Sequence, residues 1–144
     1  MENKLVIFDL DRTLHDDDYV LGDDIIGILK DLKMKNIKIA LASLNSTADH
    51  HLYNHGIEKY FDVVAFKNWR YSGSHKTDLF EYIWNKLNAN NNGTLFNDTN
   101  TLLFDDSLDA ITQAQKLQMK TIHVDPKYLL TKEVYASGLK LLGI

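Results

Sequence analysis

The sequence predicts an α/β fold in which a parallel five-stranded sheet lies between two layers of helices, a three-layer, Rossmann-like arrangement. Three observations predict it. Short apolar segments alternate along the chain with segments that carry apolar residues at helical spacing. The short segments are continuously apolar, which is typical of strands buried on both faces. Strands that alternate with helices favour right-handed crossovers and therefore a parallel sheet.

The strands are expected at short apolar segments that end in polar or turn residues. Leu5–Phe8 is the first and is followed directly by Asp9. Pro126 lies just beyond the last, where it stops the ladder of backbone hydrogen bonds because proline has no N–H to donate. In chain order, the predicted strands are residues 5–8, 37–42, 61–66, 101–104 and 119–124.

Helices are expected between and after the strands, where apolar residues recur every three to four positions. Ile25, Leu29 and Leu32 predict a helix over about residues 23–35. Gly56 is expected to end a helix over 46–55 in the left-handed conformation that glycine adopts readily. The other helices are marked by Leu79, Ile83 and Leu87, by Leu108, Ile111 and Leu117, and by the segment 131–142.

Length and composition limit the classes of function. The 144 residues suit one domain, residues 1–144, with one core. The net charge of −4 argues against a nucleic-acid partner, and the absence of cysteine excludes disulfides, thiolate zinc sites and cysteine nucleophiles. No apolar segment approaches the roughly 20 residues that span a membrane, and the N-terminus lacks a signal-peptide pattern. We therefore expect a cytoplasmic protein without a membrane partner.

Polar residues gather at the carboxyl ends of the predicted strands, where parallel α/β sheets bind their ligands. The first, second and fourth strands end in acidic or hydroxyl residues, and a lysine precedes the helix that follows the third. The residues expected to converge at this edge are Asp9, Asp11, Ser43, Lys76, Asp105 and Asp106. Carboxylates that are buried together need a compensating cation, and Mg²⁺ prefers carboxylate, water and phosphate oxygens.

This set of residues predicts phosphoryl transfer. Mg²⁺ held by Asp9 and Asp105 would offset the repulsion between a phosphate dianion and an attacking carboxylate. Asp9 is the predicted nucleophile, which forms an aspartyl-phosphate, and Lys76 and Ser43 are predicted to hold phosphate oxygens. Asp11 lies two residues further on and is the predicted general acid and base, a role that calls for a pKa tuned upward.

The same residues resemble the motifs of the haloacid dehalogenase (HAD) superfamily, in that family's order. The segments that resemble its four motifs are Val6–Leu14, Ala42–Ser43, Lys76 and Leu103–Asp106. An Asp-x-Asp-x-Thr segment alone is a moderate signal, whereas an ordered set of motifs after successive strands is a strong one. The resemblance therefore covers nearly the whole chain.

The resemblance implies a strand order of 5-4-1-2-3 and a Mg²⁺-dependent phosphatase. It implies that Asp9 is the nucleophile and that Asp11 is the acid and base. The metal ligands that it implies are Asp9, the backbone carbonyl of Asp11, Asp105 and Asp106, the last either directly or as a partner of a ligand. The phosphate-binding residues are Ser43 and Lys76, with Thr13 as a further candidate.

Within the superfamily, the chain resembles the magnesium-dependent phosphatase-1 group. Leu44 and Asp109 depart from that group's pattern. The intervals from Asp11 to Ser43 and from Ser43 to Lys76 are too short for a separate cap domain. A capless site is open, and the resemblance implies a phosphotyrosine protein or a sugar phosphate as substrate. A homodimer is one way in which such a site is covered.

Two other functions stay open at this stage. A signalling receiver domain also uses a doubly wound sheet, an acidic Mg²⁺ pocket and a lysine. Receivers place that lysine after the last strand, whereas Lys76 precedes the final acids. A catalytically inactive phosphate-binding domain would keep the scaffold without turnover, because fold alone does not carry function.

Several residues near the motifs have alternative roles. Thr13 either binds phosphate or holds the turn through a local hydrogen bond. His51 and His55 have the spacing of zinc ligands on a helix, but no third ligand is in view. Asp109 either orients Lys76 or favours the start of a helix. The sequence leaves undecided whether the substrate is contacted by His15, Trp69 or Arg70.

Overall fold

The computed structural model describes residues 3–68, 75–89 and 95–144, and its centre is a five-stranded parallel sheet. The strands are β1 (Leu5–Phe8), β2 (Lys38–Ser43), β3 (Val63–Phe66), β4 (Thr101–Asp105) and β5 (Lys120–His123). Their order is β3-β2-β1-β4-β5, and every neighbouring pair is parallel. This is the expected order read in the opposite direction, so the predicted fold class is confirmed.

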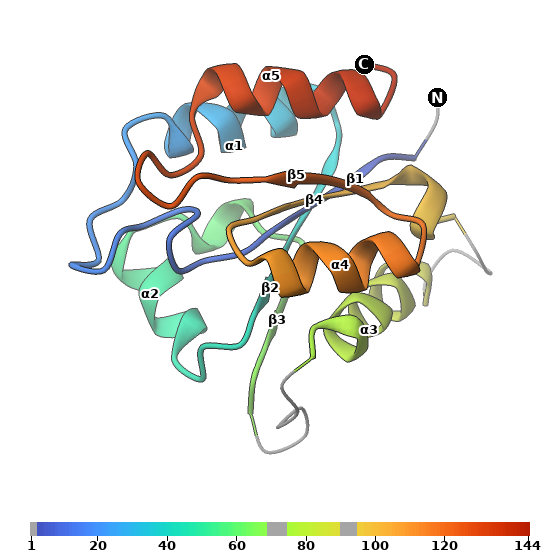
Figure 1. Cartoon of the computed structure of the whole chain (residues 1–144), viewed down its shortest axis with the longest axis horizontal. Coiled ribbons are helices and arrows are strands. Elements are labelled where there is room, and N and C mark those ends of the chain that lie inside the picture. The colour runs from blue at the N-terminus through green and yellow to red at the C-terminus, as the bar shows by residue number, and fades with distance from the viewer. Residues whose placement is uncertain (1–2, 69–74, 90–94) are drawn as a thin grey trace.

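Helices cover both faces of the sheet. They are α1 (Ile25–Met34), α2 (Ala48–Asn54), α3 (Thr77–Asn88), α4 (Leu108–Lys116) and α5 (Lys132–Leu141). Figure 1 shows α1 and α5 side by side on one face of the sheet and α3 and α4 on the other. The short helix α2 packs beside β3. Two 3-10 turns, Glu58–Tyr60 and Asp98–Asn100, lead into β3 and β4.

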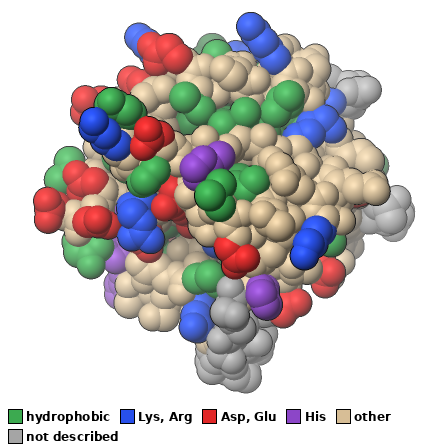
Figure 2. Space-filling model, in the orientation of Figure 1, with side chains coloured by type: hydrophobic (Ala, Val, Ile, Leu, Met, Phe, Trp, Pro, Cys, Tyr) green, Lys and Arg blue, Asp and Glu red, His purple; other side chains and the backbone are tan. Residues whose placement is uncertain are grey.

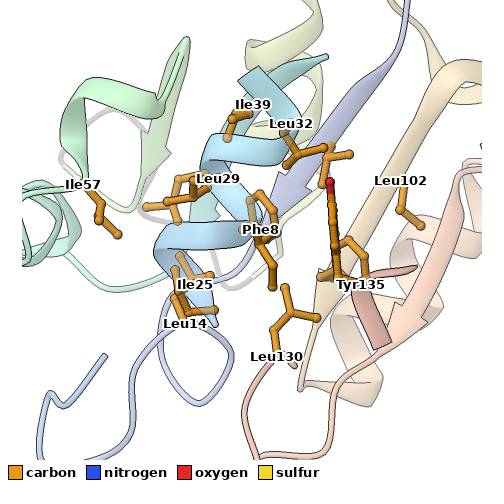
Figure 3. Close-up of a cluster of buried hydrophobic side chains, with 14 of the residues drawn as sticks. Phe8, Leu14, Ile25, Leu29, Leu32, Ile39, Ile57, Leu102, Leu130 and Tyr135 are labelled. Atoms are coloured by element: carbon orange, nitrogen blue, oxygen red, sulfur yellow. The ribbon is translucent and has the colours of Figure 1, made fainter. Parts of the chain in front are cut away.

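Strand β1 sends its side chains alternately into two hydrophobic cores, one on each face of the sheet. Val6 and Phe8 pack with α1 and α5, whereas Leu5 and Ile7 pack with α3 and α4. Figure 3 shows Phe8 at the centre of the first core, and its ring stacks on that of Phe104 with centres 5.6 Å apart. Burying each such side chain stabilises the fold by about 1.5–3 kcal/mol. The central strand is therefore firmly held, together with the residue that follows it.

The helix ends follow signals that are visible in the sequence. Gly56 follows α2 with φ of +71°, which confirms the predicted left-handed end. The side chains of Ser107 and Thr131 begin α4 and α5 by accepting hydrogen bonds from the backbone N–H groups of Ala110 and Val134. The last helix therefore lies almost where the sequence predicts it.

Two local expectations are wrong. Strand β3 begins at Val63 and not at Phe61, because the 3-10 turn at Glu58–Tyr60 delays its start. The helical spacing predicts Leu108 on the apolar face of α4, but 66% of its surface is exposed. It is the first residue of the helix, and the buried stripe is made by Ala110, Ile111 and Ala114.

The connections between the first three strands are short. One helix joins β1 to β2, and one helix with one 3-10 turn joins β2 to β3, so neither connection houses a cap domain.

Figure 2 shows acidic and basic side chains interspersed over one face of the molecule. In the described parts of the chain, no helix has both the length and the apolar character that crossing a membrane requires.

Candidate active site

Four charged side chains meet at the carboxyl end of the sheet, at the edge that the sequence predicts. Asp9 directly follows β1, and Asp105 is the last residue of the neighbouring strand β4. The Lys76 ammonium lies between them, with Nζ 2.7 Å from Asp9 Oδ1 and 2.6 Å from Asp105 Oδ2. Asp106 lies beside the other two carboxylates. We call Asp9, Lys76, Asp105 and Asp106 the charged cluster.

Backbone pairing between β1 and β4 places the two buried aspartates side by side. The Asp9 N–H donates to the Phe104 carbonyl at 3.0 Å, so the pairing continues one residue beyond β1. Asp105 is fixed by the Ser107 N–H, which donates to its Oδ1 at 2.9 Å. The Asp9 and Asp105 side chains are 8% and 0% exposed. The register of the sheet therefore joins two residues that are distant in the sequence.

The carboxylates of the charged cluster could hold a metal ion. One oxygen from each of Asp9, Asp105 and Asp106 lies within 4.8 Å of the other two. Carboxylate oxygens suit a hard divalent cation such as Mg²⁺, whereas zinc favours imidazole nitrogen and thiolate sulfur. The donor set therefore fits the ion that the sequence predicts.

Crowding shifts the acid–base behaviour of the charged cluster. Burial raises the pKa of Asp105 to about 6, against the attraction of the Lys76 charge and with the repulsion of the Asp9 charge. Burial, followed by a hydrogen bond to Asp9 and its charge, raises the pKa of Asp106 to about 7. Burial would lower the pKa of Lys76, but the two carboxylates that it touches outweigh burial and raise it. These shifts mark a site that lacks positive charge.

Lys76 is held in place from helix α4. Its backbone N–H donates to Gln113 Oε1 at 2.7 Å, and Gln113 Nε2 donates to Asp109 Oδ2 at 2.9 Å. Asp109 therefore acts on Lys76 through Gln113, and it also lies in the first turn of α4, where a negative charge is favourable. The two alternatives for Asp109 are compatible.

The two hydroxyl residues of the prediction differ in their position. The Thr13 hydroxyl donates to Asp9 Oδ2 at 3.1 Å, and its side chain is fully buried, so a local hydrogen bond is its observed contact. Ser43 ends β2, and its Oγ accepts from the Asn45 N–H at 3.1 Å. Ser43 lines the cavity described below, and Thr13 does not. A phosphate contact for either residue stays a prediction.

A cavity of about 390 Å³ lies over the charged cluster, within the usual volume range of small-molecule sites. Its wall joins the strand ends to the start of α4. The lining residues are Asp9, Asp11, Arg12, Ser43, Leu44, Asn45, Lys76, Asp105, Asp106, Ser107, Asp109, Ala110 and Gln113. All the predicted site residues except Thr13 therefore share one cavity.

Arg12 brings a second cation to this wall. Its backbone has φ of +61°, a left-handed conformation that costs a non-glycine residue about 1 kcal/mol or more. Its Nε lies 3.2 Å from Asp106 Oδ2, and its Nη1 forms a second ion pair, with Asp17 Oδ1 at 3.2 Å. The turn after β1 is therefore strained where it faces the cavity.

Asp11 has surroundings unlike those of the charged cluster. His15 Nε2 lies 2.8 Å from its Oδ1, and Asn45 Nδ2 donates to its Oδ2 at 3.0 Å. The hydrogen bond from His15 lowers the pKa of Asp11, burial opposes this, and Asn45 reinforces it. The expectation that the pKa of Asp11 is raised is therefore wrong for this arrangement, because two donors stabilise the ionised carboxylate.

Behind Asp11 lies a group of rings that we call the histidine cluster: His15, His51, His55 and Tyr19. His15 is fully buried and does not line the cavity, so it does not face a substrate there. His51 and His55 approach His15, but among the described residues the metal-binding geometry is met by the three aspartates and not by these histidines. Trp69 and Arg70 lie outside the described residues.

Sequence reasoning missed three contributors to the site. Asn45 follows the predicted Ser43 by two residues, so its proximity to that motif was the available signal. Arg12 lies between the predicted Asp11 and Thr13, so the same signal was available for it. Gln113 gave no such signal, because it acts from the second turn of α4.

Comparison with known families decides the membership of the chain. The sequence model of the haloacid dehalogenase-like hydrolase family matches residues 15–124 of this chain. The chain belongs to the haloacid dehalogenase-like hydrolase family. This HAD match begins after the Asp9–Leu14 segment, so it supports the motif resemblance independently of that segment. No curated protein matches the sequence at a significant level.

Solved structures share the HAD fold over nearly the whole chain. A protein from Listeria monocytogenes has a TM-score of 0.76 and 18% identity, with 98% of this chain and 99% of that chain covered. A proposed β-phosphoglucomutase from Thermotoga maritima has a TM-score of 0.73, 17% identity and coverage of 97% of both chains. The core domain of a proposed phosphoglycolate phosphatase from Streptococcus pneumoniae has a TM-score of 0.71 and 18% identity, with 97% of this chain and 96% of that chain covered. At these identities the likeness concerns the fold.

Proposed function

We propose that this HAD-like hydrolase is a Mg²⁺-dependent phosphatase that hydrolyses phosphomonoesters through an aspartyl-phosphate on Asp9. The observation that carries the proposal is the charged cluster: a buried carboxylate that follows the central strand, held by a buried lysine and flanked by two further carboxylates. A purely structural salt bridge would not need the two additional acids, whose pKa values are raised by burial and by the nearby charge of Asp9.

Asp9 is oriented for attack on phosphorus. Lys76 holds its Oδ1 and Thr13 its Oδ2, so the carboxylate has a single orientation at the floor of the cavity. Asp9, Asp105, Asp106 and the backbone carbonyl of Asp11 would hold Mg²⁺, which supplies the positive charge that lets a carboxylate approach a phosphate. Lys76 and Ser43 then bind phosphate oxygens while the Asp9–phosphorus bond forms and the ester bond breaks.

Asp11 is the proposed proton donor and acceptor. In the structure its two hydrogen bonds favour the ionised form. The negative charge of an incoming phosphate raises the pKa of a nearby carboxyl group, so Asp11 can take up a proton when substrate binds. It gives that proton to the leaving oxygen and then accepts one from the water that hydrolyses the aspartyl-phosphate, which releases inorganic phosphate and restores Asp9.

The substrate belongs to the same proposal. The resemblance to the magnesium-dependent phosphatase-1 group favours a phosphotyrosine protein or a sugar phosphate. Two structural neighbours carry names that refer to small phosphorylated molecules, and one of these, the proposed β-phosphoglucomutase, refers to a sugar phosphate, which supports the second class. A homodimer that covers the cavity and a cytoplasmic location complete the proposal. A panel of phosphopeptides, sugar phosphates and nucleotides, with size-exclusion chromatography and cell fractionation, tests these parts separately.

Turnover of a generic aryl phosphate with and without Mg²⁺ tests the reaction. We expect phosphate release that EDTA abolishes and Mg²⁺ restores. Asp9→Asn should remove turnover while the circular dichroism spectrum stays unchanged. The exposed Asp49→Asn in α2, which does not line the cavity, is the matched control and should keep full activity.

The outcome also separates the alternatives. Trapped enzyme should carry a hydroxylamine-sensitive phosphate on the Asp9 peptide. Stable phosphorylation without turnover would instead indicate a receiver-like domain, and neither phosphorylation nor turnover would indicate an inactive binding domain. Full activity of Asp9→Asn would remove the nucleophile assignment.

A further inference from the structure

His15 contacts the side chain of Asp11 and not the cavity. Its Nε2 lies 2.8 Å from Asp11 Oδ1, and the imidazole is fully buried. Asn45 donates to the other carboxylate oxygen at 3.0 Å. Two donors from different segments therefore hold both oxygens of Asp11, one from the loop after β1 and one from the loop after β2.

The hydrogen bonds fix which nitrogen of His15 faces Asp11 as a donor. An ionised carboxylate only accepts, so His15 Nε2 carries a hydrogen whether the imidazole is neutral or charged. In the neutral ring, Nδ1 is an acceptor, and His55 Nε2 lies 2.8 Å from it, where it can donate. His55 thus favours the one neutral tautomer of His15 that can bond to Asp11.

The surrounding rings prevent His15 from turning. The rings of His51 and His55 each meet that of His15 edge-on with centres 5.1 Å apart, and Tyr19 approaches it at 5.4 Å. Tyr19 also stacks on His51 with centres 4.6 Å apart. Helix α2 and the residue after it supply His51 and His55, so the packing of α2 against the loop after β1 fixes the orientation of the imidazole.

A histidine that served only as filler would be a costly choice here. Burying an imidazole requires partners for both of its nitrogens, and an apolar ring of similar size would need none. Here both partners are present, and one of them is the carboxylate of the proposed acid and base. The arrangement is the one by which an outer side chain orients a reacting one.

We propose that His15 is a positioning residue for Asp11, supported by His55, and that it presents the Asp11 carboxylate in one orientation to the leaving group and to the hydrolytic water. This inference rests on the proposed function. Without His15, one oxygen of Asp11 loses its donor, and the carboxylate can rotate away from the reacting oxygen. The resulting loss should appear in kcat and not in KM, because His15 lies outside the cavity.

Three substitutions at one position test the role. His15→Gln keeps an N–H near the position of Nε2, so it should retain most of the activity. His15→Asn reaches only toward His55, and His15→Phe reaches neither partner. Both should lower kcat by about 10- to 100-fold. The loss should be greater for aryl phosphates with poor leaving groups, because these depend most on the acid.

His51→Phe is the matched control. It keeps an aromatic ring edge-on to His15 and removes only ring nitrogens that do not bond to Asp11, so it should keep the wild-type kcat and the wild-type dependence on the leaving group. A loss in His51→Phe equal to that in His15→Phe would show that packing, and not the bond to Asp11, matters, and would overturn the role.

Two further measurements do not depend on His15→Phe being well folded. In the Asp11→Asn background, His15→Asn should cause no further loss, since its effect passes through Asp11. Nitrogen-15 NMR of the wild-type protein should show the His15 hydrogen on Nε2. Losses that multiply in the double variant, or a hydrogen found on Nδ1 alone, would overturn the role.

The two proposals fail in distinguishable ways. A wild-type protein that turns over no aryl phosphate and forms no phosphoenzyme overturns the proposed function and this role together. An active wild-type protein with a folded and fully active His15→Phe variant overturns the positioning role alone.

Discussion

Asp9 and Asp11 are two residues apart, yet one belongs to the charged cluster and the other borders the histidine cluster. Asp9 lies against an ammonium group and two carboxylates, and the pKa values of the neighbouring Asp105 and Asp106 are raised. Asp11 lies against an imidazole and an amide, and its pKa is lowered. One turn of backbone thus separates Asp9, in a cluster that is short of positive charge, from Asp11, whose two carboxylate oxygens each have a hydrogen-bond partner.

The difference shows how one motif supplies two carboxylates with distinct chemistry. The charged cluster becomes balanced when a cation joins it, which suits a nucleophile that must meet a phosphate. The histidine cluster needs no added charge, which suits a carboxylate that must keep one orientation while it exchanges a proton. Four predictions test this contrast, in order of decreasing effect.

Lys76→Met should have the largest effect. It removes the cation that touches Asp9 and Asp105, so turnover should fall by about 100- to 1,000-fold, as when a charge-stabilising donor is lost. Breaking a buried pair costs about 3–5 kcal/mol of folding stability. The cost should be greater at pH 8 than at pH 5, where Asp105, whose pKa is raised to about 6, can protonate. Urea unfolding at the two pH values measures it.

The exposed Lys86→Met in α3, the helix that follows Lys76, is the control for Lys76→Met and should change neither turnover nor stability. Equal destabilisation of Lys76→Met at pH 5 and pH 8 would mean that Lys76 does not compensate the carboxylates of the charged cluster.

The pH dependence of Mg²⁺ binding should be the next largest effect. The raised pKa values, about 6 for Asp105 and about 7 for Asp106, mean that the metal-free folded protein binds protons more tightly than the unfolded chain does. The stability of the metal-free protein should therefore fall as the pH rises from about 4 to 7. Its affinity for Mg²⁺ should increase over the same range, because Mg²⁺ displaces protons from the carboxylates. We expect about tenfold in affinity per pH unit for each proton displaced.

Calorimetry at several pH values, in buffers of different ionisation enthalpy, measures both the Mg²⁺ affinity and the protons released. The Asp106→Asn variant should lose the part of the slope near pH 7. Affinity that does not vary between pH 5 and 8 would contradict the raised pKa values of the charged cluster.

Thr13→Val should have a moderate effect. It removes the hydrogen bond to Asp9 Oδ2 while keeping the shape of the side chain, at a cost of about 1.5–3 kcal/mol for a bond to a charged group. Thermal unfolding should show that loss, and kcat should fall because Asp9 is free to rotate. Thr112→Val on the exposed face of α4 is the control, and a Thr13→Val variant with wild-type kcat would separate orientation from turnover.

Gln113→Ala should have the smallest effect. Gln113 bonds to the backbone N–H of Lys76 and not to its charge, so a loss of about 0.5–1.5 kcal/mol and a small decrease in kcat are expected. The exposed Gln115→Ala on the same helix is the control. A decrease as large as that of Lys76→Met would mean that the position of Lys76, more than its charge, limits catalysis.

Much of the fold could be predicted because its signals are local. The strand Leu5–Phe8, the left-handed Gly56 and the helix that begins after Thr131 each follow from a few neighbouring residues. The start of β3 and the exposure of Leu108 could not be predicted in the same way, because a 3-10 turn and the orientation of α4 decide them.

The same distinction between local signals and tertiary packing applies to the residues of the site. The amino-acid sequence alone predicts that Asp9, Ser43 and Asp105 meet, because the carboxyl ends of parallel strands share one edge of the sheet. Only the folded structure shows that His15 and Asn45 bind Asp11 and that Gln113 holds Lys76. Such contacts depend on the directions of side chains in loops and on how helices pack, and neither leaves a regular spacing in the sequence.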